Sequence, residues 1–172
     1  MTSIETRPET ARGRAMYEML LAVHAVIRRN LELIQELAAQ ALDGADPEEL
    51  RRQLHTLKRD GMLWRLQVNC LRYCSFVHSH HNAEDADFFV ELRETNPAIS
   101  PGIDRLQADH RRVSDDLDAV EDAANRLAED DGQQAREAVV ETLQALRENL
   151  LAHLEYEERV IEATVRRVRE LP

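Results

Sequence analysis

Glycine and proline divide the chain into four long segments, each with a helical pattern of apolar residues. Neither residue type occurs within 14–43, 62–96, 103–131 or 133–171. In each segment, apolar positions recur alternately three and four residues apart, as they do on the core-facing side of a bundle helix. The pattern therefore predicts four long helices.

Residues that commonly begin or end helices stand at the ends of these segments. A glycine follows the first segment, a proline follows the second, a serine-proline pair is expected to cap the third, and glycine separates the third from the fourth. These signals are Gly44, Asn96-Pro97, Ser100-Pro101 and Asp131-Gly132. Four helices joined by short connections predict an all-α, up-down-up-down four-helix bundle.

A shorter helix is expected between the first two long helices. Asp46-Pro47 is typical of an N-cap followed by proline at the first helical position, so we place an accessory helix at 47–60, outside the bundle layer. The bundle domain then covers 13–172. The polar segment 1–12 before it is expected to be a flexible N-terminal arm.

The apolar stripe of the second helix changes position near its end. Beyond Glu84, strict spacing would reach Asp87, so the apolar face is expected to shift to Phe88 and Leu92. On the fourth helix, the stripe is expected to continue to Val160.

Composition agrees with one helical domain. Only 4% of the 172 residues are aromatic, and this low content disfavours a strand-rich fold. The formal net charge of -11 disfavours nucleic acids and anionic membrane surfaces as partners. No apolar stretch is long enough for a membrane span or a leader, and the chain is expected to be cytoplasmic. Cys70 and Cys74 are one helical turn apart and are expected to stay reduced.

Ionisable side chains interrupt the apolar stripes in every long helix. Each helix places at least one imidazole on its stripe, and the second and fourth helices add a carboxylate one turn later. The six residues are His24, His80, Glu84, His110, His153 and Glu157. A single histidine on an apolar face is commonly a hydrogen-bonded core residue, but four at once need another explanation.

The positions of these residues along the helices bring them to one layer of the predicted bundle. With a rise of about 1.5 Å per residue, the four histidines lie about 18 to 20 residues from the same end of the bundle. No lysine or arginine lies on the stripes, so the buried carboxylates would be uncompensated charges. The sequence therefore predicts a cation in this layer.

The number of donor atoms favours two metal ions. Four imidazoles and two bridging carboxylates offer about eight donor atoms, whereas two octahedral ions need about 12. An oxo or hydroxo bridge would fill two further positions and leave about two for a small diatomic molecule or peroxide. Mixed histidine and carboxylate ligation with open positions favours iron over zinc or magnesium.

Two other kinds of metal site fit the sequence poorly. A ferritin-like centre needs Glu-x-x-His on two helices, and no histidine here has glutamate three residues before it. A zinc site from Cys70, Cys74 and His78 would extend about 12 Å along one helix, which is too far for one ion. The cysteines are interpreted as small core residues.

Four motifs in this order carry a family resemblance: the lone His24, His80-x-x-x-Glu84 within HSHHNAEDADFF, His110 in LQADHRRV, and His153-x-x-x-Glu157 within LLAHLEYEERV. Together they resemble the bacterial hemerythrin-like (HHE cation-binding) domain family. The resemblance implies a non-haem centre of two iron ions, Fe²⁺ or Fe³⁺, bridged by Glu84 and Glu157. Oxygen-carrying relatives have a second histidine four residues after the third-helix histidine, where this chain has Ser114.

Three further residues are candidates for roles near the metal ions. His81 adjoins His80 and is either a fifth imidazole ligand or a partner of Asp85 at the surface. Tyr73, seven residues before His80, and Tyr156, beside Glu157, are candidate electron donors, although core packing is the favoured explanation for both.

The sequence leaves three classes of function open. The first is a di-iron protein that reacts with or binds dioxygen, nitric oxide or peroxide, as a sensor, scavenger or weak peroxidase. The second is a reversible oxygen carrier or iron-storage module. The third is a di-iron oxidase of an organic substrate, which would need a pocket beside the iron ions.

Overall fold

The computed structural model describes residues 4, 7–42 and 62–169, and all its regular elements are helical. The helices are α1 (Ala11–Leu42), α3 (Met62–Ala83), α4 (Phe89–Thr95), α5 (Ser100–Glu129) and α6 (Gln133–Val165). No strand occurs among the described residues, so the all-α prediction is confirmed there. Across the same part of the chain, no helix carries an apolar stretch that could span a membrane.

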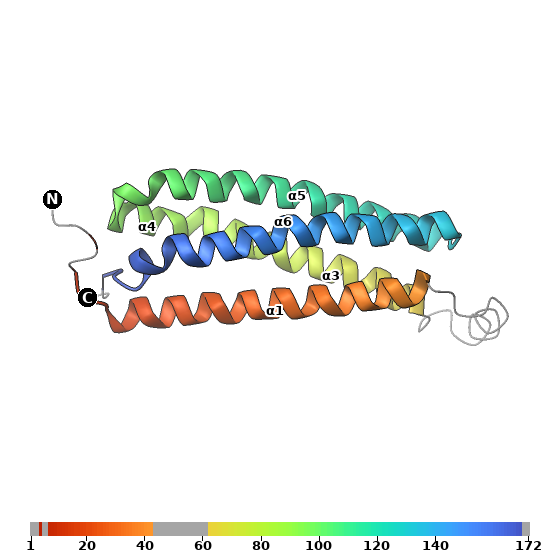
Figure 1. Cartoon of the computed structure of the whole chain (residues 1–172), viewed down its shortest axis with the longest axis horizontal. Coiled ribbons are helices and arrows are strands. Elements are labelled where there is room, and N and C mark those ends of the chain that lie inside the picture. The colour runs from red at the N-terminus through yellow and green to blue at the C-terminus, as the bar shows by residue number, and fades with distance from the viewer. Residues whose placement is uncertain (1–3, 5–6, 43–61, 170–172) are drawn as a thin grey trace.

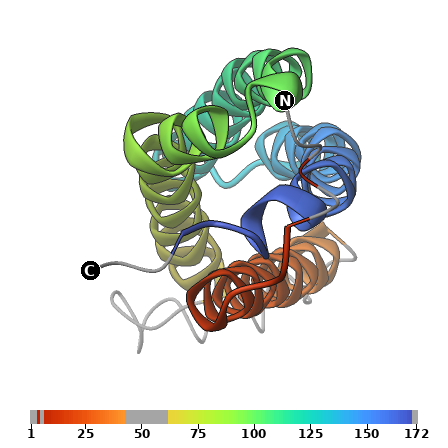
Figure 2. The same ribbon diagram turned by 90° about the vertical axis from the view of Figure 1, so that its left-hand side faces the viewer.

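The long helices lie side by side along the molecule and form a helical bundle (Figure 1). Helix α5 packs on α6, α6 on α1, α1 on α3 and α3 on α5, which closes a ring around a common core (Figure 2). The predicted accessory helix at 47–60 lies outside the described residues.

The predicted apolar stripes form the core, with two local differences. Every stripe position of α1 from Tyr17 to Ile34 and of α5 from Ile103 to Leu127 is buried. On α6, Val160 is only half-buried, and the adjacent Ile161 is buried in its place.

The second difference arises from a π-helical turn over Glu84–Phe88, which joins α3 to α4. Its signature is the hydrogen bond that the amide of Phe89 donates to the carbonyl of Glu84, five residues earlier. Because this turn contains one extra residue, the next core residue after Glu84 is Phe89. Phe88, where the sequence placed the shifted apolar face, is only half-buried. Leu92 is buried as predicted.

A short 3₁₀ turn over Pro97–Ile99 connects α4 to α5. The side chain of Asn96 accepts a hydrogen bond from the amide of Ala98 at 3.3 Å and donates one to the hydroxyl of Thr164 at 3.0 Å. The second long helix ends before Asn96-Pro97, as predicted. Ser100 is the first residue of α5 and makes no side-chain cap, so the predicted cap at this position is wrong.

The apolar core consists of two clusters, one on each side of a polar layer. One cluster contains Ile27, Val113 and Leu150, and the other contains Leu20 and Leu106. Between these groups, each long helix has one or two buried ionisable residues. The fold therefore encloses a polar layer between two hydrophobic clusters.

The beginning of α1 packs tightly against the end of α6. The Thr10 hydroxyl caps α1 by accepting a hydrogen bond from the amide of Gly13 at 2.9 Å, and it donates one to the Val168 carbonyl at 2.7 Å. A Cβ atom on Gly13 would lie 2.5 Å from the carbonyl carbon and oxygen of Arg166. Glycine is therefore required by the close approach of two backbones.

Replacing Gly13 with alanine is expected to destabilise the fold by about 1–3 kcal/mol, because backbone atoms must move apart. The melting temperature should fall by about 2–4 °C for each kcal/mol. Gly132→Ala is the matched control, since the three atoms nearest to its Cβ would all belong to the Asp130 side chain, the closest at 3.1 Å. Thermal denaturation of both variants checks this, and an unchanged melting temperature for Gly13→Ala would contradict the close packing.

Candidate metal centre

The polar layer collects side chains from all four long helical segments. Helix α1 contributes His24, α3 contributes His80 and His81, the π-helical turn contributes Glu84, α5 contributes His110, and α6 contributes His153 and Glu157. His24 and Glu157 are completely shielded from solvent, and His80 is the one member that is not fully buried. The structure thus brings the six predicted residues together and adds His81, the seventh candidate.

The donor atoms form two groups. In the first, atoms of His24, His80 and Glu84 lie within 4.8 Å of one another. In the second, the same holds for His81, His110 and His153. Each group is small enough to surround one ion.

Each of the two glutamates, of which Glu84 already belongs to the first group, lies close to histidines of both groups. Oε1 of Glu84 is 3.3 Å from Nε2 of His80, and its Oε2 is 3.6 Å from Nε2 of His110. Oε2 of Glu157 is 3.4 Å from Nε2 of His24 and 3.6 Å from Nε2 of His153. Each carboxylate therefore approaches one histidine of each group, which is the placement that a bridging ligand needs.

The residues of the layer fit metal ions because their donor atoms lack other partners. Both carboxylate oxygens of Glu84 and of Glu157, and Nε2 of all five histidines, are buried without a hydrogen bond within the described chain. Buried polar atoms are normally hydrogen-bonded, because desolvation without a partner is costly. Imidazole and carboxylate donors suit transition metals, iron among them.

Burial shifts the pKa values of the layer in opposite directions. For His80 and His153, burial and the neighbouring imidazoles lower the pKa to about 3, so both rings are neutral near pH 7 and able to bind metal. Burial also raises the pKa of Glu84 and Glu157, and the charge of Glu157 adds to the effect on Glu84. Without cations the carboxyl groups tend to keep their protons, so metal binding should release protons.

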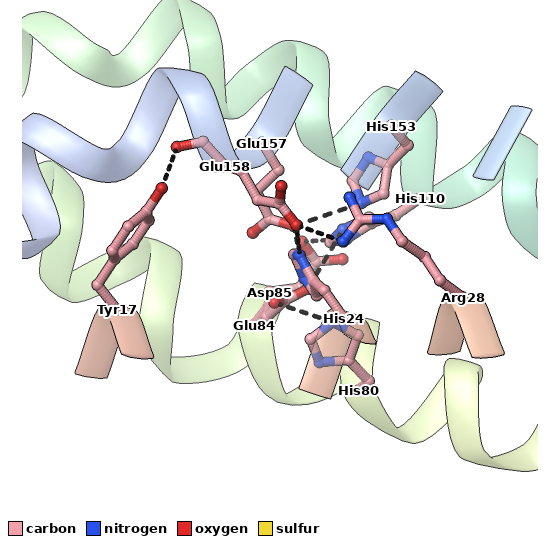
Figure 3. Close-up of polar contacts among 10 residues, drawn as sticks. All are labelled: Tyr17, His24, Arg28, His80, Glu84, Asp85, His110, His153, Glu157 and Glu158. Carbon is pink, nitrogen blue, oxygen red and sulfur yellow. Dashed lines mark hydrogen bonds and ion pairs between the residues drawn. The ribbon is translucent and has the colours of Figure 1, made fainter. Parts of the chain in front are cut away.

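Outside this layer, carboxylates bind Nδ1 of two of the histidines, His24 and His110, on the side of each ring away from the layer (Figure 3). Nδ1 of His24 donates to Oε1 of Glu158 at 2.8 Å, and Arg28 donates to the same oxygen at 2.8 Å. Although burial raises the pKa of Glu158, hydrogen bonds from Arg28 and His24 outweigh it and hold the pKa below its ordinary value. Nδ1 of His110 donates to Oδ1 of Asp85 at 3.1 Å.

Sequence reasoning missed Glu158 and Arg28 and considered Asp85 only as a partner of His81. The available signal was position: Asp85 and Glu158 each directly follow a candidate ligand, and Arg28 lies one helical turn after His24.

The structure places His81 inside the layer and not beside Asp85. Its side chain is buried, and its ring stacks on that of His110 with the centroids 4.1 Å apart. The ring also lies 5.1 Å from that of His153. Asp85 instead binds His110, so the surface pairing with His81 is not observed.

The two tyrosine candidates lie apart from this group. Tyr73 is buried, its hydroxyl has no hydrogen-bond partner among the described residues, and it precedes His80 by two helical turns, about 10 Å along α3. Tyr156 is half-buried beneath Arg105, whose guanidinium carbon is 3.7 Å from the ring centroid. Neither tyrosine belongs to the donor groups, and their roles stay predictions.

The cysteines are free and buried, in agreement with the core interpretation. Burial raises the pKa of the Cys70 thiol to about 12, which keeps it protonated and unreactive. His78, the third member of the rejected zinc site, faces Asp118 at 3.6 Å.

Two surface grooves, of about 420 and 300 Å³, have the size of small-molecule pockets. The larger lies between α1 and α3 and includes Leu33, Tyr73 and Phe76, and the smaller lies between α1 and α6. Neither contains any of the seven residues of the layer.

The comparisons with known proteins agree with this geometry. Residues 15–165 match the family model described as "Hemerythrin HHE cation binding domain". The match covers most of the chain, and the chain belongs to this family. No curated protein and no solved structure matches it.

The stability of the metal-free chain is expected to fall as the pH rises from about 7 to about 9. A raised pKa for Glu84 means that the folded state holds a proton that the unfolded state has released, so the stability that this proton contributes is lost progressively as the pH rises from the ordinary carboxyl pKa toward the raised pKa of the folded state. The lowered histidine pKa values cost stability only below about pH 6.5 and do not affect this window.

Glu84→Gln should reduce the loss between these pH values by about 1–3 kcal/mol. Glu155→Gln, at an exposed position of α6, is the control and should leave the loss unchanged. Urea denaturation of the metal-free variants at several pH values makes the comparison, and parallel profiles for all three proteins would refute a buried Glu84 carboxylate.

Proposed function

From membership of the hemerythrin HHE cation-binding family, we propose that this protein holds two iron ions in its polar layer and binds or reacts with a small molecule there. The expected partners are dioxygen, nitric oxide or peroxide. The observation that carries the proposal is the set of unpartnered donor atoms, namely both oxygens of Glu84 and Glu157 and Nε2 of five histidines.

Each ion has its own group of proposed ligands. His24 and His80 would hold one ion, and His81, His110 and His153 would hold the other. Glu84 and Glu157 would bridge them, since each lies near a histidine of both groups. An oxo or hydroxo bridge is the proposed further link. Two iron ions with open positions supply redox chemistry toward dioxygen, nitric oxide and peroxide.

The chain's own contribution is to orient the donors and exclude bulk water. The ring of Phe89 stacks on His110 with the centroids 5.4 Å apart, and hydrophobic clusters cover the layer on both sides. The bridging position of the carboxylates depends on the π-helical turn and on the register of α6. The proposed topology is an up-down-up-down bundle, in which helices of alternating direction bring the ligand motifs to the same level along the bundle axis.

We propose a sensor or scavenger, or a weak peroxidase, in the cytoplasm, in preference to an oxidase of an organic substrate. The two grooves support this choice, because no residue of the layer lines them. Tyr73 is the better candidate for an electron donor, since it is buried on α3, two helical turns before His80, whereas Tyr156 lies under Arg105.

Reversible oxygen carriage is the second candidate, and one observation favours it. The chain has Ser114 where oxygen-carrying relatives are expected to have another histidine, but His81 supplies a fifth imidazole from α3. A fifth imidazole would close one of the open positions and leave a pair suited to binding one small ligand.

Iron content is the first test. The chain reconstituted without oxygen is expected to hold about two irons, and His110→Ala should hold fewer, because one group then loses a ligand. His78→Ala is the matched control, since His78 lies on α3 but pairs with Asp118 and belongs to neither donor group. Metal analysis decides the matter, and one zinc per chain or no bound iron would refute the proposal.

The response to oxygen separates the two candidates. The reduced, iron-loaded protein is expected to be oxidised by oxygen or peroxide within seconds to minutes and to stay oxidised after degassing. Stopped-flow absorption over repeated oxygen cycles measures this. Full and repeated recovery of the reduced spectrum on degassing would replace the scavenger proposal with the carrier.

A further inference from the structure

Two pairs of consecutive acidic residues each hold a histidine of a neighbouring helix. In the first pair, Glu84 and Asp85 approach His110 of α5 from its two nitrogen atoms. Oε2 of Glu84 is 3.6 Å from Nε2, and Oδ1 of Asp85 accepts a hydrogen bond from Nδ1 at 3.1 Å. The first acid thus faces the layer and the second lies behind the ring.

Glu157 and Glu158 of α6 repeat this arrangement at His24 of α1 (Figure 3). Oε2 of Glu157 is 3.4 Å from Nε2, and Oε1 of Glu158 accepts a hydrogen bond from Nδ1 at 2.8 Å. Helices α1 and α5 are the two that contribute a single histidine to the layer and no carboxylate. The same arrangement therefore occurs on both of them.

We propose that Asp85 and Glu158 are positioning residues that set the tautomer and orientation of His110 and His24. A neutral imidazole carries its proton on either nitrogen, and only the Nδ1–H form leaves the Nε2 lone pair for a metal ion. A carboxylate that accepts from Nδ1 selects this form and restrains the ring. The inference rests on the proposed function only in treating Nε2 as the metal-binding atom.

The two positioning residues are held differently. Glu158 shares its Oε1 with Arg28, whose guanidinium donates at 2.8 Å, so Glu158 is both oriented and partly neutralised. Asp85, with 36% of its side chain exposed, has no cationic partner within the described chain. Arg28 is therefore expected to act on His24 through Glu158 and to have no effect on His110.

The first experiment measures the tautomers directly in the metal-free protein. Nitrogen–proton correlation spectra of ¹⁵N-histidine-labelled protein should show the Nδ1–H form for His24 and His110. Asp85→Ala should remove this preference at His110 alone, and Glu158→Ala at His24 alone. Asp87→Ala and Glu155→Ala, at exposed acids of the same two segments, are matched controls.

The second experiment measures Fe²⁺ affinity without oxygen, by competition with a chelator. Each alanine variant should bind Fe²⁺ about 10- to 100-fold more weakly. Asp85→Asn and Glu158→Gln should lose less, because an amide oxygen can still accept from Nδ1, and they keep the test valid if an alanine variant fails to fold. Arg28→Met and Glu158→Gln should be non-additive, whereas Arg28→Met and Asp85→Asn should be additive.

The two experiments separate failure of this inference from failure of the proposed function. Unchanged tautomers or unchanged Fe²⁺ affinity in both alanine variants would overturn the positioning role, even in a protein that binds two irons. A chain that binds no iron would overturn the proposed function, and the tautomer spectra would still decide what Asp85 and Glu158 do.

Discussion

The arrangement of this bundle depends on placing two carboxyl groups and five imidazoles in a core layer to which the described residues contribute no lysine or arginine side chain. Glu84 and Glu157 have no hydrogen-bond partner for any carboxylate oxygen within the described chain. Hydrophobic clusters lie on both sides, so water cannot readily solvate the layer. Such a layer is stable only when cations neutralise it or when the carboxyl groups retain their protons.

This constraint explains local features that core packing alone would not require. An uninterrupted α-helix would bury residues at strict spacings of three and four, whereas the π-helical turn allows both Glu84 and Phe89 to face the core. The same turn contains Asp85, which reaches His110 on the next helix. One backbone irregularity therefore positions the proposed bridging ligand Glu84, the acid Asp85 that binds His110, and the aromatic ring of Phe89. Such π-helical turns are common at functional sites.

Much of the fold could be predicted because periodicity and breaker residues are local properties. The stripes of α1 and α5 and the convergence of the six polar residues follow from helical geometry. The π-helical turn could not be predicted in detail, because the sequence showed only a shift of the apolar face. The partners Glu158 and Arg28 were missed because cross-helix hydrogen bonds depend on rotamers and on helix rotation, which spacing along one helix does not fix. For the same reason, the sequence did not determine whether the side chain of His81 lies in the layer or at the surface.

Burial of the layer also connects metal content to folding. A surface site could lose its ions at little cost, but here the metal-free state retains buried carboxyl groups whose preferred protonation differs from that of the loaded state. Ligands that bind only the folded state add their binding free energy to its stability. Because every long helix supplies at least one proposed ligand, the ions would connect all four helices at mid-core. Loss of the ions should therefore weaken the bundle as a whole, beyond the local contacts of any single ligand.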